Sequence, residues 1–589
     1  MKRQTKQFLA PIKKGSNSKN SYNIYPSYHT SEGEIHKGYD KLVNEIIHKE
    51  YVILDGYIGT DWKEIINNFT KIISSKGKSI STIFIDDFLK TEEDILQIIS
   101  PFLGGNDPVF GRITTLNLND LFNKKELENL SFKEDTDIKI IYGSGASLVN
   151  KEGFLIYFDL PKNELQYRMR SGSVTNIGLK STKDLKQMYK HFYFIDWVLL
   201  NKEKKRLLPD IDILVDQQRP ENPIWMHGKT LRKTLDQMSK NFFRVRPWFE
   251  PGVWGGNWIK NRFEQLNKDV PNYAWSFEMI VPENGLMLEN NGYLLEISFD
   301  MLMFQAGENI LGKAAKRFKD EFPIRFDFLD TYEGGNLSVQ CHPKTEYIKK
   351  EFGESFTQDE TYYILDAEKD ATVYLGFQEN IDPERFKKEL HTSFATKETL
   401  DIEEYVQKFH AKKHDLFLIP NGTVHCSGIN NLVLEISSTP YIYTFKMYDW
   451  QRLDLDGNPR PLNIDRAFEN LNFNRKGSVV QETLISKPKV TEIGSDWKKI
   501  HLPTHKEHFY DIYRYEFDTN IEIYTQDQCH ILMLVEGESI ELISKNGQKQ
   551  IFNYAETFTV PAAAKKYKVV NKGHSPAKLI VSFVKDEAC

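Results

Sequence analysis

Short apolar runs separated by helical segments dominate the first third of the chain. Each of four such runs is followed by a glycine or an acidic residue: 51–55, 82–85, 138–142 and 154–158. Strands of parallel sheets are buried on both faces and read as continuous apolar runs, and glycines and acids collect where they end. The pattern predicts an α/β doubly wound domain over residues 39–215, preceded by a polar segment at 1–38 that forms a tail or an arm docked on the body.

The pattern changes near residue 241. Short strands now alternate with Gly, Asn and Pro turns, as in Glu283-Asn-Gly285 and Glu289-Asn-Asn-Gly292. This alternation is typical of all-β sandwiches and barrels. It predicts a β domain over 241–484 with a helical insert at about 383–410. A second β-barrel is expected at 485–589, and residues 216–240 form a connector between the α/β and β domains.

Composition narrows the possible partners. The 589 residues are 40% apolar and 13% aromatic, which is enough to bury several cores. Lys and Arg number 77 against 83 Asp and Glu, so the chain lacks the basic footprint of a nucleic-acid or anionic-membrane binder. There is no apolar stretch near 18 residues, no signal-peptide core and no paired-cysteine motif. We expect a cytoplasmic protein without nucleic-acid or membrane partners.

A metal-ligand pattern lies in the first β domain. Gln340 and His342 are two residues apart in a predicted strand, so their side chains point to one face. Glu360 opens a later strand, and His425 follows a Pro-Asn-Gly turn. Two histidines, one carboxylate and one amide oxygen suit Zn²⁺ with an open position for substrate. Such a site keeps a net charge of about +1, which favours an anionic sugar phosphate.

The same positions fall within motifs of a known family. Trp254-Gly-Gly256, Leu337-Ser-Val-Gln-Cys-His-Pro343, Pro420-Asn-Gly-Thr-Val-His425 and Leu434-Glu-Ile436 occur in order, followed by Tyr448-Asp-Trp450 and Asp456-Gly-Asn-Pro-Arg460. Over residues 245–475 the chain resembles the class I, zinc-dependent, cupin-type mannose-6-phosphate isomerases. The resemblance implies a cupin (jelly-roll) domain and a second, cupin-like barrel at the C-terminus. It also implies one Zn²⁺ per chain held by Gln340, His342, Glu360 and His425, with Ser338 contacting the substrate phosphate.

The sequence departs from the family at substrate-handling positions. Gln358 stands where the family has lysine, and Lys446 where it has the catalytic arginine. Aldose–ketose isomerisation needs a proton carrier and a cation near the developing charge. Lys446 is the candidate cation, Glu435 and Asp449 are candidate proton carriers, and Arg452 is a candidate substrate-binding residue. Structural roles for the carboxylates, and surface ion pairs for Lys446 and Arg452, are open alternatives.

The N-terminal domain has the layout of a phosphate-binding loop without its cation. A strand, Gly56-Tyr-Ile-Gly59 and a helix follow one another, but Asp61 replaces the lysine of a Walker A motif. The region resembles a degenerate nucleoside-kinase-like P-loop domain. Arg168 and Arg170 could bind an anion as a lid does, or form an ordinary solvated helix face. We expect no ATP turnover here, and a scaffolding or regulatory role.

The leading hypothesis is a metal-dependent aldose–ketose isomerase acting on a sugar phosphate, of the mannose-6-phosphate isomerase type. The alternative is a metal-binding cupin that binds a sugar, sugar phosphate or nucleotide as a regulator without isomerising it. A sugar or nucleoside kinase is a third possibility, opposed by the missing Walker lysine.

Overall fold

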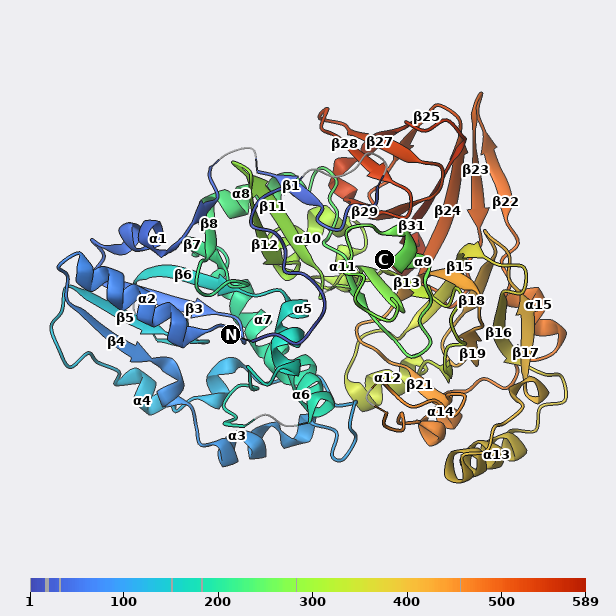
Figure 1. Cartoon of the computed structure of the whole chain (residues 1–589), viewed down its shortest axis with the longest axis horizontal. Coiled ribbons are helices and arrows are strands. Elements are labelled where there is room, and N and C mark those ends of the chain that lie inside the picture. Colours follow the sequence, from blue (N-terminus) through green and yellow to red (C-terminus); the bar gives the residue numbers. More distant parts are fainter. Residues whose placement is uncertain are drawn as a thin grey trace. The chain divides into compact units, whose positions relative to one another are not determined.

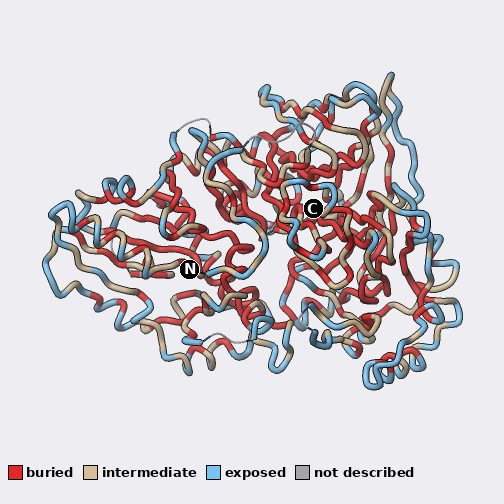
Figure 2. The backbone as a smooth tube through the Cα atoms, in the orientation of Figure 1, coloured by how far each residue is buried: buried red, intermediate tan, exposed pale blue. Residues whose placement is uncertain are grey.

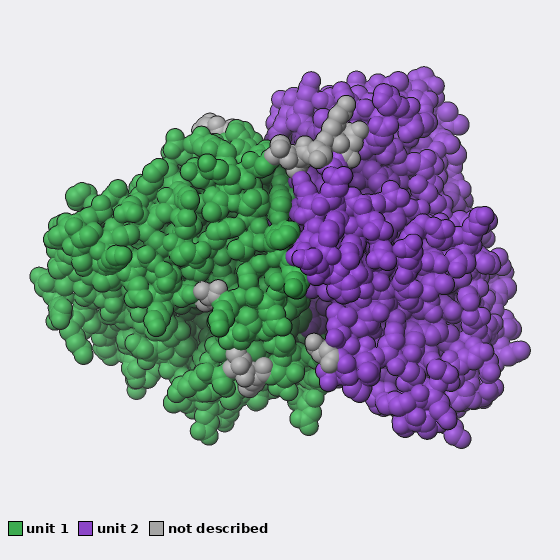
Figure 3. Space-filling model, viewed as in Figure 1, with its two compact units in different colours: residues 1–16, 25–238, 282–306 green, residues 17–24, 239–281, 307–589 purple. Residues whose placement is uncertain are grey.

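The computed structural model describes residues 2–15, 21–30, 33–149, 152–181, 184–281, 283–455 and 457–589. Asp456 of the sequence motif above lies outside these residues. The chain divides into two compact units, which Figure 3 colours separately. Unit 1 comprises residues 1–16, 25–238 and 282–306, and unit 2 comprises residues 17–24, 239–281 and 307–589.

Unit 1 is built on a seven-stranded sheet with the order β2-β8-β7-β6-β3-β5-β4 (Figure 1). The five strands from β4 to β7 are parallel, and β8 and β2 are added antiparallel at one edge. The strands are β2 His36–Lys37, β3 Tyr51–Gly56, β4 Ile80–Phe84, β5 Ile138–Tyr142, β6 Phe154–Asp159, β7 Ile213–Asp216 and β8 Ile224–His227. Four of the parallel strands correspond to the apolar runs of the sequence.

Helices cover this sheet. Apolar side chains of α1 (Tyr39–Ile46) and α2 (Trp62–Ser75) share one buried cluster with strands β3, β5, β6 and β7. Asp61 caps α2, because its side chain accepts a hydrogen bond from the backbone N–H of Glu64. The remaining helices are α3 Glu92–Ile99, α4 Lys124–Glu128, α5 Lys162–Arg170, α6 Leu185–His191, α7 Trp197–Leu207 and α8 Gly228–Met238.

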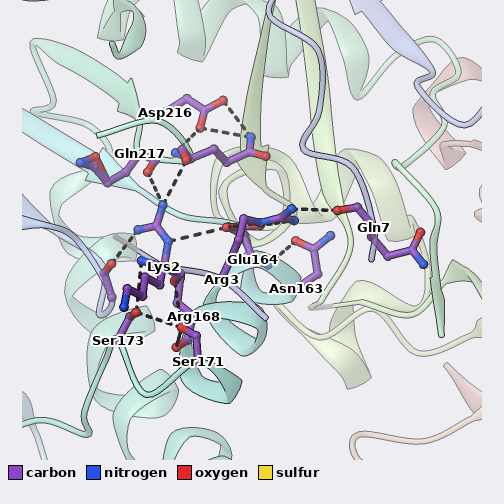
Figure 4. A network of polar contacts seen from close by, with 12 residues as sticks. Lys2, Arg3, Gln7, Asn163, Glu164, Arg168, Ser171, Ser173, Asp216 and Gln217 are labelled. Atoms are coloured by element: carbon purple, nitrogen blue, oxygen red, sulfur yellow. Dashed lines mark hydrogen bonds and ion pairs between the residues drawn. The ribbon is translucent and has the colours of Figure 1, made fainter. Parts of the chain in front are cut away.

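Arg168 of α5 is buried, with 2% of its surface exposed, and its guanidinium binds two loops, one at Gly59 and one at 217–218 (Figure 4). It donates to the carbonyl of Gly59 at 2.8 Å and to those of Gln217 and Gln218 at 2.7 and 3.2 Å. Glu164, one helical turn earlier, lies 3.7 Å from its Nε. The guanidinium is thus committed to backbone carbonyls, and it is not the mobile anion-binding lid residue that the sequence suggested.

We therefore expect Arg168→Met to destabilise unit 1 by about 3 kcal/mol, because three buried carbonyls and Glu164 lose their charged donor. Urea unfolding followed by hydrogen exchange of β3 and β6 measures the change. Arg170→Met, two residues away on the partly exposed end of α5, is the matched control and should cost under about 1 kcal/mol. Equal effects of the two substitutions would contradict the structural role of Arg168.

Unit 1 also contains a segment from the middle of the chain. β11 (Gly285–Asn290) pairs with β1 (Ser27–His29) and with β12 (Tyr293–Ser298), which leads to α10 (Asp300–Leu311). The backbone N–H groups of Glu296 and Ser298 donate to Asp216 and Asp159 at the ends of β7 and β6. Buried Lys204 lies 3.0 Å from Asp159. These polar contacts bind the segment 282–306 to the α/β domain.

Of two expected segments, one differs from the structure. Residues 216–240 were expected to form a connector, but they contribute β8 and α8, and β8 extends the sheet because Ile224, Trp225 and Met226 are buried. Residues 1–38 were expected to form a polar tail or a docked arm, and their described part agrees with the arm, because it carries β1 and β2 and is hydrogen-bonded to later residues, for example through Arg3 and Glu164. A polar composition therefore did not exclude ordered structure in either segment.

Unit 2 begins with two antiparallel sheets, ordered β18-β15-β20-β13-β10-β9 and β17-β16-β19-β14-β21. The strands are β9 Trp248–Glu250, β10 Trp275–Met279, β13 Arg325–Asp330, β14 Val339–Cys341, β15 Asp359–Ala367, β16 Thr372–Phe377, β17 Val406–His410, β18 Leu416–Ile419, β19 His425–Ser427, β20 Asn431–Ser438 and β21 Phe445–Tyr448. The helices are α9 Trp258–Arg262, α11 Ala315–Phe318, α12 Thr345–Phe352, α13 Pro383–Thr396, α14 Ile464–Asn470 and α15 Ser478–Thr483.

The helical insert is shorter than the predicted 383–410. Helix α13 begins at Pro383 after the capping residue Asp382 and ends where Lys397 adopts a left-handed conformation. Residues 406–410 instead form the edge strand β17, which pairs with β16. Most of α13 is exposed, as Figure 2 shows in pale blue, so it contributes little to the core around the sheets.

A second pair of antiparallel sheets ends the chain, ordered β22-β23-β24-β31-β26-β29 and β25-β30-β27-β28. Its strands are β22 Lys489–Ile493, β23 Trp497–Leu502, β24 Tyr510–Phe517, β25 Asn520–Tyr524, β26 His530–Glu536, β27 Ser539–Ser544, β28 Lys549–Asn553, β29 Thr557–Val560, β30 Lys566–Asn571 and β31 Ala577–Val584. Both sheets contribute to one buried apolar cluster, so they pack face to face. Its expected relation to cupin barrels stays a prediction. Among all the described residues, no helix is long and apolar enough to cross a bilayer.

Candidate metal centre

Three buried side chains meet between the first two antiparallel sheets of unit 2, the sheets that contain β15 and β14. Glu360 lies in β15 of one sheet, while His425 begins β19 and His342 follows β14 of the other. Their ligand atoms all lie within 4.8 Å of one another. Glu360 Oε1 is 2.7 Å from His425 Nε2, and Glu360 Oε2 is 3.2 Å from His342 Nε2. Within the described residues this is the one such grouping of His, Cys, Asp or Glu.

Backbone carbonyls orient both imidazoles. Nδ1 of His342 lies 2.9 Å from the carbonyl of Tyr443, and Nδ1 of His425 lies 2.9 Å from that of Thr423. A proton on Nδ1 satisfies each carbonyl and leaves the Nε2 lone pair directed at Glu360. Nε2 of His342 is buried but makes no hydrogen bond of good geometry. Two Nε2 lone pairs that point toward the Glu360 carboxylate form, together with this carboxylate, a ligand set that suits a divalent cation.

The cluster buries a charged carboxylate, that of Glu360, between two histidines. Burial alone would lower the pKa of His342, but the adjacent Glu360 raises it above its usual value. Burial alone would raise the pKa of Glu360, but His342 and His425 hold it well below the usual range. The carboxylate therefore stays ionised, which is the form that binds a metal.

Gln340 completes the group predicted from the sequence. In the antiparallel ladder Gln340 stands opposite His425 on one side and Lys446 on the other, so the three side chains share one face of the sheet. The Gln340 amide lies 3.4 Å from Nε2 of His425. The amide's oxygen and nitrogen can exchange places, which offers the oxygen as a fourth ligand. The structure thus brings all four predicted ligands together and places Lys446 beside them.

Glu435 lies on the strand next to Glu360. Glu435 of β20 stands opposite Tyr362 of β15 and Asp327 of β13, and Tyr362 shares a strand face with Glu360. Burial and the nearby carboxylates Asp327 and Glu360 raise the pKa of Glu435 well above its usual value. Burial and Glu360 raise the pKa of Asp327 in the same way. Sequence reasoning missed Asp327, although the alternation of charged and aromatic residues from Arg325 to Phe328 was its signal.

Ser338, Asp449 and Arg452 form a separate polar cluster. Ser338 donates to the Asp449 carboxylate at 2.7 Å, and Arg452 donates to it at 2.8 Å. Arg460, which sequence reasoning quoted only as part of a motif, lies 2.6 Å from the same carboxylate. Two guanidinium groups against one carboxylate leave this cluster with one net positive charge. Asp449 is thus fixed between cations, unlike Glu435.

Gln358 is positioned to orient Glu360, because its amide donates to Glu360 Oε2 at 3.1 Å and both side chains are buried. We expect Gln358→Leu to lower the metal affinity by about 10–100-fold, since hydrogen bonds to a ligand fix its orientation. Competition with a chelating dye measures this affinity. Gln378→Leu removes an amide that binds the carbonyl of Glu403 instead and should leave the affinity unchanged.

Comparison with known proteins gives one family model for the N-terminal part of the chain and several curated relatives. A family model described as a domain of unknown function (DUF8485) matches residues 38–240. Mannose-6-phosphate isomerase ManA of Bacillus subtilis is 27% identical over 224 residues, which are 38% of this chain and 66% of that protein. Mannose-6-phosphate isomerase of Streptococcus mutans is 26% identical over 227 residues, 38% of this chain and 65% of that protein. The probable mannose-6-phosphate isomerase GmuF of Bacillus subtilis is 25% identical over 321 residues, 54% of this chain and 92% of that protein.

Among solved structures, the mannose 6-phosphate isomerase of Bacillus subtilis covers 58% of this chain and 99% of its own, at 20% identity and a TM-score of 0.47. A putative mannosephosphate isomerase from Archaeoglobus fulgidus has a TM-score of 0.44 at 18% identity, covering 59% of this chain and 98% of its own. Relatives of this chain are mannose-6-phosphate isomerases. All are distant, and the alignments with ManA and the Streptococcus protein span about two thirds of those proteins.

Proposed function

We propose that unit 2 is a metal-dependent aldose–ketose isomerase that converts mannose 6-phosphate to fructose 6-phosphate. The observation that carries the proposal is the buried His342–Glu360–His425 group with both Nε2 atoms aimed at one carboxylate. It occurs in a chain whose relatives are mannose-6-phosphate isomerases. With Gln340 as the fourth ligand, these residues would hold Zn²⁺, which when bound supplies Lewis-acid polarisation of substrate oxygens.

Proton transfer is assigned to Glu435. Isomerisation removes the proton on C2 of the aldose and returns a proton to C1, so one group must act as base and then as acid. Burial and the neighbouring carboxylates raise the pKa of Glu435, which makes it a stronger base than an exposed carboxylate and lets it keep the proton that it takes from C2 until C1 accepts it. Asp449, which was the other candidate, is held by Ser338 and two arginines. We assign it to positioning these groups.

Charge stabilisation is assigned to Lys446, and phosphate binding to the polar cluster. Lys446 stands in the ladder position next to Gln340, on the face that carries the proposed ligands. An ammonium there would stabilise the negative charge that develops on oxygen as the C2 proton leaves. Ser338 and Arg452, together with Arg460, offer a hydroxyl and two guanidinium groups to the substrate phosphate.

The test is a coupled assay of the zinc-loaded full chain with mannose 6-phosphate. Formation of fructose 6-phosphate is the expected result, and it should disappear after chelation and return with metal. The alternative, a metal-binding cupin that binds its sugar ligand as a regulator, is favoured by Gln358 and Lys446 at positions where the resembled family has other residues. Calorimetric binding of hexose phosphates without turnover would support that alternative and contradict the isomerase.

For unit 1 we propose a degenerate P-loop-like domain that does not hold a triphosphate. The loop after β3 leads into α2 as a phosphate-binding loop does, but Asp61 takes the cap position and Arg168 is committed to the carbonyl of Gly59. A carboxylate at the helix N-terminus, with the nearby Arg168 guanidinium held by backbone carbonyls, opposes a polyanion. Calorimetry with ATP and Mg²⁺ should find no binding in the low micromolar range.

A further inference from the structure

A cavity of about 610 Å³ lies in unit 1, where three neighbouring parallel strands end. Its walls come from the loop 58–60 after β3, from Asp86 after β4 and from Ser144 after β5. The start of α3 and the segment 172–180 after α5 close the remaining sides. Ligands of open α/β sheets bind at the carboxyl ends of the strands, and this volume is within the ordinary range of small-molecule sites.

The walls are fixed by buried polar contacts. The Asp55 carboxylate accepts hydrogen bonds from the backbone N–H groups of Gly56, Gly145 and Ser147, which holds the loop that carries Ser144. Arg168 holds Gly59 from the other side, and Figure 4 shows Ser171 and Lys2 bonded to Ser173 in the wall. The cavity is therefore a built feature of the domain, and it does not depend on one loop conformation.

The charges around the cavity do not favour a phosphate. The charged side chains of its lining are Asp86, Glu92, Lys90 and Lys180, whose charges sum to zero when Asp86 is ionised. The Lys90 ammonium donates to the backbone carbonyl of Asp120 at 2.7 Å. At the start of α2, the amide of Glu64 is already bonded to the Asp61 carboxylate. An anion entering here would meet a capped helix and no surplus cation.

Several polar groups of the lining are available to a neutral ligand. The Asp86 carboxylate and the hydroxyls of Ser144 and Thr175 form no hydrogen bond with any described residue, and Asp86 has no oppositely charged partner among them. The cavity walls and the neighbouring Asp87 and Asp55 raise the pKa of Asp86 to about 7, so this carboxyl can accept or donate. Trp62 adds a large, partly exposed ring to the same lining.

We propose that this cavity binds an uncharged sugar ring through its vicinal hydroxyl groups, with Asp86 as the main hydrogen-bonding group and the Trp62 ring as the apolar wall. A carboxylate and two hydroxyls match the alternating donors and acceptors of a sugar, and an aromatic ring covers its apolar face. A free hexose and the ribose of a nucleoside share this chemistry. The site is separate from the metal centre and does not depend on the proposed isomerase activity.

The test is isothermal calorimetry on the full chain with mannose, fructose, glucose, uridine and adenosine, each beside its phosphorylated form. Because sugars can also enter the metal centre, the criterion is binding that depends on Asp86 and survives His342→Ala. We expect at least one uncharged probe to bind with a Kd below about 1 mM. Asp86→Asn should weaken it by about tenfold or more, since a hydrogen bond to a charged group is lost.

Asp87→Asn is the matched control, because it removes the same charge one residue away from a side chain outside the lining. It should change the affinity by less than about twofold. Hydrogen exchange should show protection of residues 58–62 and 172–180 by the same probe. If only the hexoses give a binding heat in calorimetry, the ligand of the cavity is a free sugar. If only the nucleosides do, the ligand is a nucleoside. Binding that ignores Asp86→Asn, tighter binding of the phosphorylated forms, or no binding of any uncharged probe at 20 mM would overturn the proposal.

Discussion

His342→Ala is expected to abolish metal binding and isomerase turnover together. The substitution removes one of two aimed imidazole nitrogens and leaves the Glu360 carboxylate buried beside a single histidine. A site reduced from four ligands to three loses most of its affinity for a structural or catalytic Zn²⁺. Metal analysis after gel filtration should fall from about one ion per chain to less than about a tenth of that, and turnover should fall in proportion.

His391→Ala is the control for this experiment. His391 lies on the exposed face of α13, where its ring is 3.4 Å from Asp465, so its removal should leave the metal content of the protein unchanged. If His342→Ala retained as much metal as the wild type, the metal would be bound elsewhere and the proposed centre would be incorrect. A parallel circular dichroism spectrum separates metal loss from unfolding.

Lys446→Met is expected to lower kcat by about 10²–10³-fold while the metal stays bound. The methionine keeps the length of the side chain but removes the ammonium that we place near the developing negative charge. Lys446→Arg should keep or raise activity if the pocket accommodates a guanidinium, which binds oxyanions in a bidentate manner. Steady-state assays with mannose 6-phosphate, together with metal analysis, measure both variants.

Lys408→Met is a suitable control. Lys408 lies on the edge strand β17 and forms an ion pair with the exposed Glu403, so its substitution should not change kcat. If Lys446→Met turned over substrate at the wild-type rate, Lys446 would not be the charge stabiliser. Arg452 would then be the next candidate. If the wild type were inactive and Lys446→Arg gained turnover, the protein would instead be a regulator that descends from an enzyme.

The grouping of the candidate metal ligands could be predicted from the sequence, partly from local rules and partly from the family resemblance. The spacing of Gln340 and His342 fixes a common strand face, and the turn before His425 fixes where the next strand begins. The parallel strands of unit 1 were equally visible, because burial on both faces makes their sequences continuously apolar.

The features that were missed depend on contacts between distant residues. Nothing near Arg168 in the sequence indicates that its partners are the carbonyls of Gly59 and Gln217. Asp327 gains its environment only when β13 pairs with β20, more than 100 residues later. The connector expected at 216–240, and the place of residues 282–306 within the expected β domain, differ from the structure for the same reason, since strand pairing and buried carboxylates decide to which unit these residues belong.

The assignment of residues 282–306 to unit 1 sets an order of events during synthesis. A ribosome that has completed residue 238 has not yet made β11, with which β1 pairs, nor β12, which contains the Ser298 amide that donates to Asp159. The α/β domain therefore cannot reach its final hydrogen bonding until about seventy further residues have emerged, by which time residues 239–281 of unit 2 have also been made. A chain cut at residue 240 would separate residues 282–306 from the rest of unit 1 and residues 17–24 from the rest of unit 2, so neither fragment would contain a complete unit.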